Sequence, residues 1–122
     1  MELAELKHVL LDRPGTTEEI PFGPEALVYK VMGKMFAIVD WQGDPLHITL
    51  KCDPDQAMFL RDLYPAVKPG YHTNKIHWNT VELDGSVPYA ELRGMIDDSY
   101  ALVVKSLTRK QREELETLGR SS

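Results

Sequence analysis

Residues 69–81 concentrate side chains that could perform recognition or chemistry. The stretch holds two histidines, a tyrosine, a tryptophan, a lysine and two asparagines, and no acidic residue interrupts it. Imidazoles can ligate metals or carry protons, whereas aromatic rings and amides can stack on bases or bond to base edges. An ordinary structural strand does not need this combination, so we expect the stretch to form the functional surface.

A metal site here would draw on His72 and His77, with His47 and Cys52 as further ligands. Structural zinc sites use four close ligands that come in pairs of short, regular spacing. His72 and His77 lie five residues apart across a predicted turn, which matches no standard spacing. The sequence therefore predicts hydrogen-bonded histidines, with no metal and no cofactor.

Nucleophilic catalysis would depend on Cys52, which follows Lys51 and precedes a predicted helix start. The local field there would favour a thiolate, but a small apolar residue also suits such a strand-to-helix corner. The sequence shows no triad, no glycine-rich phosphate loop and no dinucleotide fingerprint. We therefore predict no catalytic residue and a protein that is not an enzyme.

The bulk composition is that of a single globular domain spanning residues 1–122, with a net charge of −5 and one cysteine. Met1 leads directly into Glu2, without the basic and apolar segments of a signal peptide. No apolar run approaches the roughly 20 residues that cross a bilayer. These features predict a cytoplasmic protein that does not enter membranes.

The first half of the chain predicts a helix followed by an antiparallel sheet. Residues 2–12 have helical spacing, and residues 16–20 could form a short edge strand. Residues 26–31, 34–41 and 46–51 read as strands of a meander, joined at Met32-Gly33 and at residues 42–45. In the third strand Leu46, Ile48 and Leu50 should face the core, with the intervening residues on the other face.

The second half predicts three helices and further strand structure. Asp53 should cap a helix that ends at residue 63 or 64, and residues 76–82 read as a strand. Residues 88–106 form the longest predicted helix, and Thr108 with Gln111 should start a short, highly charged one over residues 109–118. The expected fold is a two-layer α+β domain with an antiparallel sheet packed against helices, in the order helix, three strands, helix, two strands, helix. The core should lie within residues 1–107, with the last helix peripheral.

Several short segments resemble the bacterial MmcQ/YjbR family. The resemblance runs from about Pro14 to Leu107 and rests on segments 30–37, 50–54, 69–72, 77–81 and 98–100. It implies a compact α+β fold similar to type III secretion chaperones, described as a "double wing" DNA-binding-like domain. The family pattern commonly has a methionine after Tyr-His and a basic residue before His-Trp, where this chain has Thr73 and Ile76.

Two binding functions fit these observations. The first is DNA binding, in which a basic hairpin and the central stretch would supply Lys30, Lys34, Lys51, Lys68, Tyr71, His72, Asn74, Lys75, His77, Trp78 and Asn79. It requires Lys30, Lys34, Lys51 and Lys75 on one exposed surface. The alternative is binding of a protein or peptide partner, as in secretion chaperones, which requires an exposed apolar groove.

Overall fold

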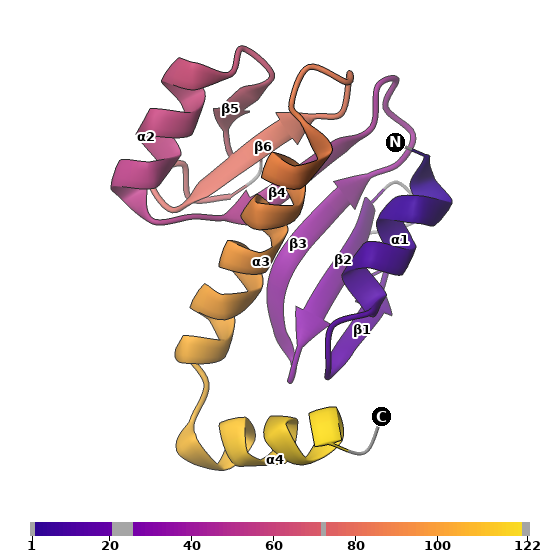
Figure 1. Ribbon diagram of the computed structural model, residues 1–122, viewed down its shortest axis with the longest axis vertical. Coiled ribbons are helices and arrows are strands. Elements are labelled where there is room, and N and C mark those ends of the chain that lie inside the picture. Colours follow the sequence, from indigo (N-terminus) through magenta and orange to yellow (C-terminus); the bar gives the residue numbers. More distant parts are fainter. Residues whose placement is uncertain (1, 21–25, 72, 121–122) are drawn as a thin grey trace.

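The computed structural model describes residues 2–20, 26–71 and 73–120 and confirms the α+β class (Figure 1). One antiparallel sheet has the strand order β1-β2-β3-β4-β6-β5. The elements in chain order are α1 (Leu3–Leu11), β1 (Thr16–Glu19), β2 (Ala26–Val31), β3 (Lys34–Asp40), β4 (His47–Lys51), α2 (Pro54–Leu63), β5 (Val67–Pro69), β6 (Trp78–Glu82), α3 (Tyr89–Lys105) and α4 (Arg109–Arg120).

The predicted meander is present in β2, β3 and β4, and β1 adds to it as the edge strand. Met32 and Gly33 join β2 to β3 with φ angles of 50° and 83°. Two consecutive left-handed residues form the tight turn whose twist matches a hairpin. A register shift between Tyr29 and Lys30 interrupts the pairing with β3.

The predicted helix starts are also confirmed. The Asp53 side chain accepts hydrogen bonds from the backbone N–H groups of Asp55 and Gln56 at the start of α2. Thr108 and Gln111 form the reciprocal capping box before α4. Because these caps depend on residues close in sequence, they could be predicted without knowledge of the tertiary fold.

One face of the sheet carries the core. α1, α2 and α3 cover this face, and α3 packs across β3 and β4 (Figure 1). Side chains alternate across each strand, so Ile48 and Leu50 are buried under the helices while Thr49 lies on the other face. Phe36 meets Tyr100 of α3 edge-to-face, with ring centroids 5.4 Å apart.

Ser99 of α3 is a fully buried polar residue that connects this helix to the sheet. Its hydroxyl donates to the Phe36 carbonyl oxygen at 2.6 Å and accepts from the Lys51 N–H at 2.9 Å. Two backbone groups that the sheet leaves unpaired are thereby satisfied. The contact fixes α3 over both β3 and β4.

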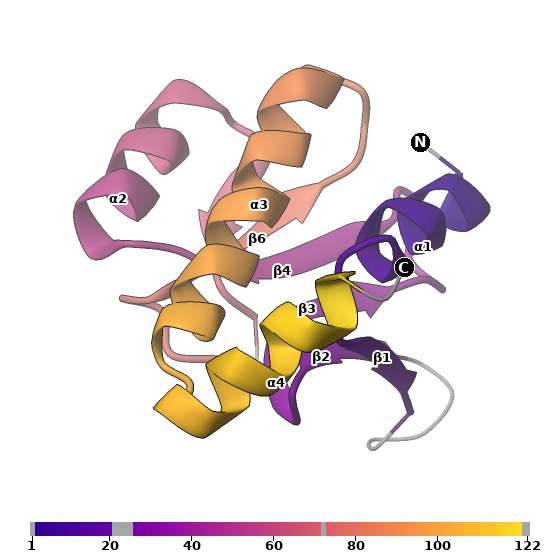
Figure 2. The same cartoon turned by 60° about the horizontal axis from the view of Figure 1, so that its bottom comes forward.

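α4 is less peripheral than its charge pattern predicts. It lies across one end of the molecule, as Figure 2 shows, and Leu115 is 7% exposed and belongs to the core. A Cβ atom on Gly15 would lie 2.5 Å from Leu115 Cδ1, and Gly15 has a φ of 72°. A glycine therefore permits this close approach.

One strand was not located from the sequence. Residues 67–69 form β5 at one edge of the sheet, whereas β1, expected as a short edge strand, forms the opposite edge. β5 has only three residues, too few to show a periodic pattern. Among the described residues, no helix combines the length and apolar character needed to cross a bilayer.

Candidate functional site

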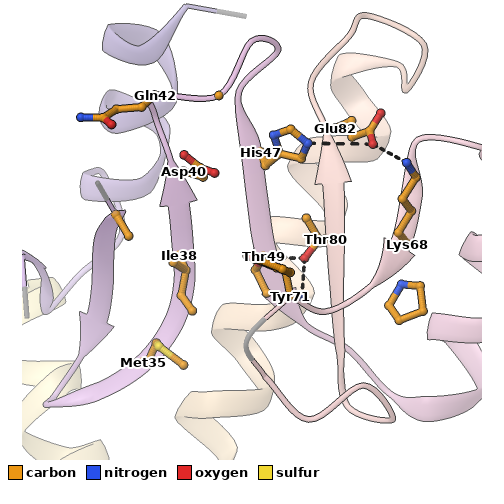
Figure 3. A pocket seen from close by; sticks show the side chains of 13 residues that line it. Met35, Ile38, Asp40, Gln42, His47, Thr49, Lys68, Tyr71, Thr80 and Glu82 are labelled. Carbon is orange, nitrogen blue, oxygen red and sulfur yellow. Dashed lines mark hydrogen bonds and ion pairs between the residues drawn. The ribbon is translucent and has the colours of Figure 1, made fainter. Parts of the chain in front are cut away.

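The face of the sheet opposite the helices carries a groove of about 1170 Å³. All of its described lining residues come from the strands and from the loops that join them, so the helix layer does not cover it (Figure 3). The groove spans the sheet from β2 to β5.

The half of the groove on β4, β5 and β6 is polar. Glu82 lies between Lys68, whose Nζ is 2.5 Å from Glu82 Oε1, and His47, whose Nε2 is 3.9 Å from the same oxygen (Figure 3). Beside them the hydroxyls of Thr49 and Thr80 share a hydrogen bond of 2.8 Å. These side chains form a prearranged set of donors and acceptors on the groove floor.

The half of the groove on β2 and β3 is largely apolar, with Met35 and Ile38 along β3 and Asp40 at its end (Figure 3). Ala26 of β2 also lines this half. Ile38 stands directly across from Thr49 in the neighbouring strand. The apolar and polar halves therefore meet along the boundary between β3 and β4. This arrangement can hold a ligand that has both apolar and polar groups.

The predicted functional stretch forms a loop and β6 at one side of the groove. Arg61 of α2 anchors it: Nε donates to Asn79 Oδ1 at 2.7 Å, and Nη2 donates to the carbonyls of Lys75 and Trp78. The Asn74 side-chain oxygen accepts from the backbone N–H groups of Ile76 and His77. Both asparagines of the stretch therefore help to hold the loop in place.

Two of the predicted site residues are corrected by this geometry. Asn79 is 3% exposed, and its amide donates to the Ala57 carbonyl, so it cannot reach a base edge. Lys34 donates to the carbonyl of Ser106 at the end of α3, on the helix side of the sheet. Side chains alternate between the two faces of the sheet, and the irregularity between β2 and β3 shifts this alternation. The Lys34 side chain therefore lies on the face opposite to that of Lys30 and Lys51.

Three of the four other predicted lysines have a partner within the protein. Lys30 pairs with Glu19, Lys68 pairs with Glu82, and Lys75 donates to the Gly70 carbonyl oxygen. No described carboxylate lies within ion-pair distance of the partly exposed Lys51 ammonium. Two of these lysines, Lys30 and Lys68, therefore already have a carboxylate partner.

The aromatic residues and histidines of the stretch differ in exposure. Tyr71 is 66% exposed, His77 is exposed, and Trp78 is half-buried opposite Lys51 in the β4–β6 pair. His72 lies outside the described residues. Within the described parts of the chain, no three metal-ligating side chains come together.

Cys52 lies under α3 as a buried thiol. Burial raises its pKa to about 11, and the carboxylates of Asp98 and Asp53 add to that shift. The helix start and Arg61 lower the pKa by less than burial raises it, so the apolar interpretation of Cys52 is the correct one. The thiol is protonated near neutral pH.

We expect the Cys52 thiol to resist alkylation in the folded protein. Since its pKa is about 11 rather than the ordinary 9.0, the thiolate fraction near about pH 8 falls about 100-fold, and burial slows the reaction further. Iodoacetamide labelling followed by mass spectrometry should show slow reaction without urea and fast reaction with it. Equal rates in the two conditions would contradict the buried, protonated thiol.

Sequence reasoning missed Arg61, Met35 and Ile38. Arg61 sits in a helix pattern that gives no sign of a partner 14 to 18 residues away. Met35 and Ile38 read as ordinary strand residues, because only the sheet order shows which face remains open. The alternation of His47 and Thr49 with core residues was the one available signal for this face.

Comparison with known proteins agrees with this architecture. The family model described as YjbR matches residues 11–102. The Escherichia coli O157:H7 protein YbdF is 38% identical over 110 residues, covering 89% of both chains. YjbR of Escherichia coli K12 is 33% identical over 115 residues, covering 94% of this chain and 98% of its own.

Two crystal structures are similar as well. The Deinococcus radiodurans protein DR2400, with a DUF419 domain, superposes with a TM-score of 0.89 at 40% identity, covering 94% of this chain and 88% of its own. A Pseudomonas syringae protein superposes with a TM-score of 0.71 at 27% identity, covering 84% of this chain and 98% of its own. Sequence and fold agree, and the chain belongs to the YjbR family.

Proposed function

We propose that the protein is a binding module that takes up an amphipathic peptide segment of a partner protein in the sheet-face groove. The observation that carries this proposal is the division of the groove into an apolar half with Met35 and Ile38 and a polar half with His47, Lys68 and Glu82. A segment with one apolar side and one polar side matches both halves at once.

The size of the groove favours a macromolecular ligand. Small-molecule sites are usually enclosed hollows of about 300–1,000 Å³ that surround most of the ligand. This groove has a volume of about 1170 Å³ and lies open along the sheet face. A peptide can fill such a surface while its outer side remains in water.

The charges of the groove disfavour a polyanion. Asp40 and Glu82 contribute two carboxylates, and Lys68, already paired with Glu82, contributes the lysine among the lining residues. Binding of nucleic acid depends on protein cations that neutralise the phosphates. Here the carboxylates of the groove would instead repel the phosphates. A neutral or weakly basic peptide meets no such penalty.

The test is selection of short random peptides on the intact protein, followed by fluorescence anisotropy with the best binder. Ile38→Glu and Met35→Glu should each weaken binding at least about tenfold, because a charge replaces apolar floor. Leu118→Glu, on the exposed side of α4, is the control and should leave affinity unchanged. Failure to enrich any peptide, or equal affinity of all variants, would overturn the proposal.

DNA binding is the second candidate, supported by the exposed, acid-free segment with Tyr71, Lys75 and His77 beside Lys51. Labelled duplex DNA distinguishes it in the same anisotropy assay at low and at physiological salt. Binding that weakens with salt, is lost in Lys75→Glu and survives Ile38→Glu would favour DNA over peptide. Absence of DNA binding at low salt would remove this candidate.

A further inference from the structure

A second apolar surface lies on α2, in the layer opposite the groove. Figures 1 and 2 both show α2 at the edge of the helix layer, beyond α3. Met58, Phe59 and Leu63 are 63%, 57% and 53% exposed, although the helix has only 10 residues. Isolated exposed apolar residues are ordinary, whereas exposed apolar patches bordered by polar residues mark interaction sites.

These side chains share the outward half of the helix. Ala57 and Leu60 face the core, and Arg61 points to the loop that it anchors. With 3.6 residues per turn, Phe59 and Leu63 line one flank of the outward half and Met58 lines the other. Asp55 and Asp62 fall between the two flanks, so the surface is apolar at its sides and acidic along its middle.

The acidic residue near the helix end has no role in stabilising α2. Asp62 lies in the last turn, where the helix dipole disfavours negative charge. No base stands three or four residues from it, and the helix's one base, Arg61, is engaged by Asn79 and the loop carbonyls. An unfavourable carboxylate among exposed apolar side chains is expected where a partner supplies the missing cation.

We propose that the outward face of α2, formed by Asp55, Met58, Phe59, Asp62 and Leu63, is a docking surface for a basic amphipathic helix of a partner protein. Leucine-like side chains of the partner would pack against the two apolar flanks, and lysine or arginine side chains between them would pair with Asp55 and Asp62. This complementarity of charge sets the class of partner. This surface is separate from the groove. The proposal for α2 therefore does not depend on the function that we propose for the groove.

The test uses a labelled synthetic helix with leucine flanks and a central lysine row, and a second peptide with glutamate replacing lysine. The lysine peptide should bind the full-length protein in fluorescence anisotropy, and the glutamate peptide should bind at least about tenfold more weakly. Asp55→Asn with Asp62→Asn, and separately Phe59→Gln with Leu63→Gln, should each weaken the lysine peptide at least about tenfold.

Matched controls distinguish binding at this surface from effects of net charge and of exposed apolar residues elsewhere on the protein. Glu5→Gln with Glu114→Gln changes net charge equally on α1 and α4, and Leu11→Gln with Leu118→Gln removes exposed apolar residues elsewhere. Both controls, and the groove variant Ile38→Glu, should bind like the wild type.

Equal loss in the controls, or equal binding of the two peptides, would overturn the proposal. A wild-type dimer in sedimentation velocity that Phe59→Gln with Leu63→Gln dissociates would also overturn it, since the occupant would then be a second copy.

Discussion

Replacing Arg61 with methionine is expected to lower the free energy of unfolding by about 3 kcal/mol. The guanidinium donates to the side-chain oxygen of Asn79, which is 3% exposed, to the Lys75 carbonyl in the loop and to the Trp78 carbonyl in β6. Methionine retains the apolar stem but leaves the Asn79 oxygen buried without its donor. An unpaired buried acceptor costs about 1–3 kcal/mol, and the lost bonds from a charged donor add to that.

Urea denaturation followed by circular dichroism measures this change. Arg93→Met is the matched control, because Arg93 is exposed on α3 and has no hydrogen bond or ion pair with the described residues; it should change stability by less than about 0.5 kcal/mol. If both arginine variants unfold at the same urea concentration, Arg61 does not anchor the loop as the structure indicates.

The second large effect is expected from Gly70→Ala, which should cost about 3 kcal/mol. A Cβ atom at this position would lie 2.7 Å from Trp78 Cβ and 3.0 Å from the Trp78 carbonyl oxygen, and it would also clash with the Thr73 hydroxyl. Gly70 also donates its N–H to that carbonyl at 2.9 Å. The methyl group cannot be placed unless the chain after β5 moves away from β6.

Gly94→Ala provides the opposite expectation within the same protein. Gly94 lies inside α3, and nothing comes within 4 Å of an added Cβ atom. Alanine there should stabilise the protein by about 0.5–1 kcal/mol, since it restricts the unfolded chain and favours the helix. Thermal unfolding of both variants tests the pair; destabilisation of both would mean that the environment of Gly94 is tighter than described.

Local features of the fold were predictable because their causes lie close together in sequence. Asp53 caps the residues that directly follow it, and Met32-Gly33 turns the chain between adjacent strands. The alternation that placed Ile48 and Leu50 in the core is likewise confined to one strand. Each of these signals depends on fewer than about seven neighbouring residues.

The candidate site was only partly predictable because it depends on contacts between distant segments. The position of Lys34 depends on the end of α3, and the burial of Asn79 depends on α2. Similarly, the burial of Leu115 in an otherwise charged helix follows from the space left by Gly15. The lysine, histidines and asparagines of residues 69–81 indicated a binding surface. Asn74 and Asn79 instead hold the loop in place.

The insertion of β6 between β4 and β5 has a consequence for biosynthesis. β2, β3 and β4 are consecutive in the chain, so all residues of the apolar half of the groove are synthesised before β5 and β6. The polar half, with Lys68 and Glu82, must wait for β5 and β6, and the core remains open until α3 is made. The groove that we propose as a peptide site is therefore complete only after β6, the last strand in the chain, has joined the sheet.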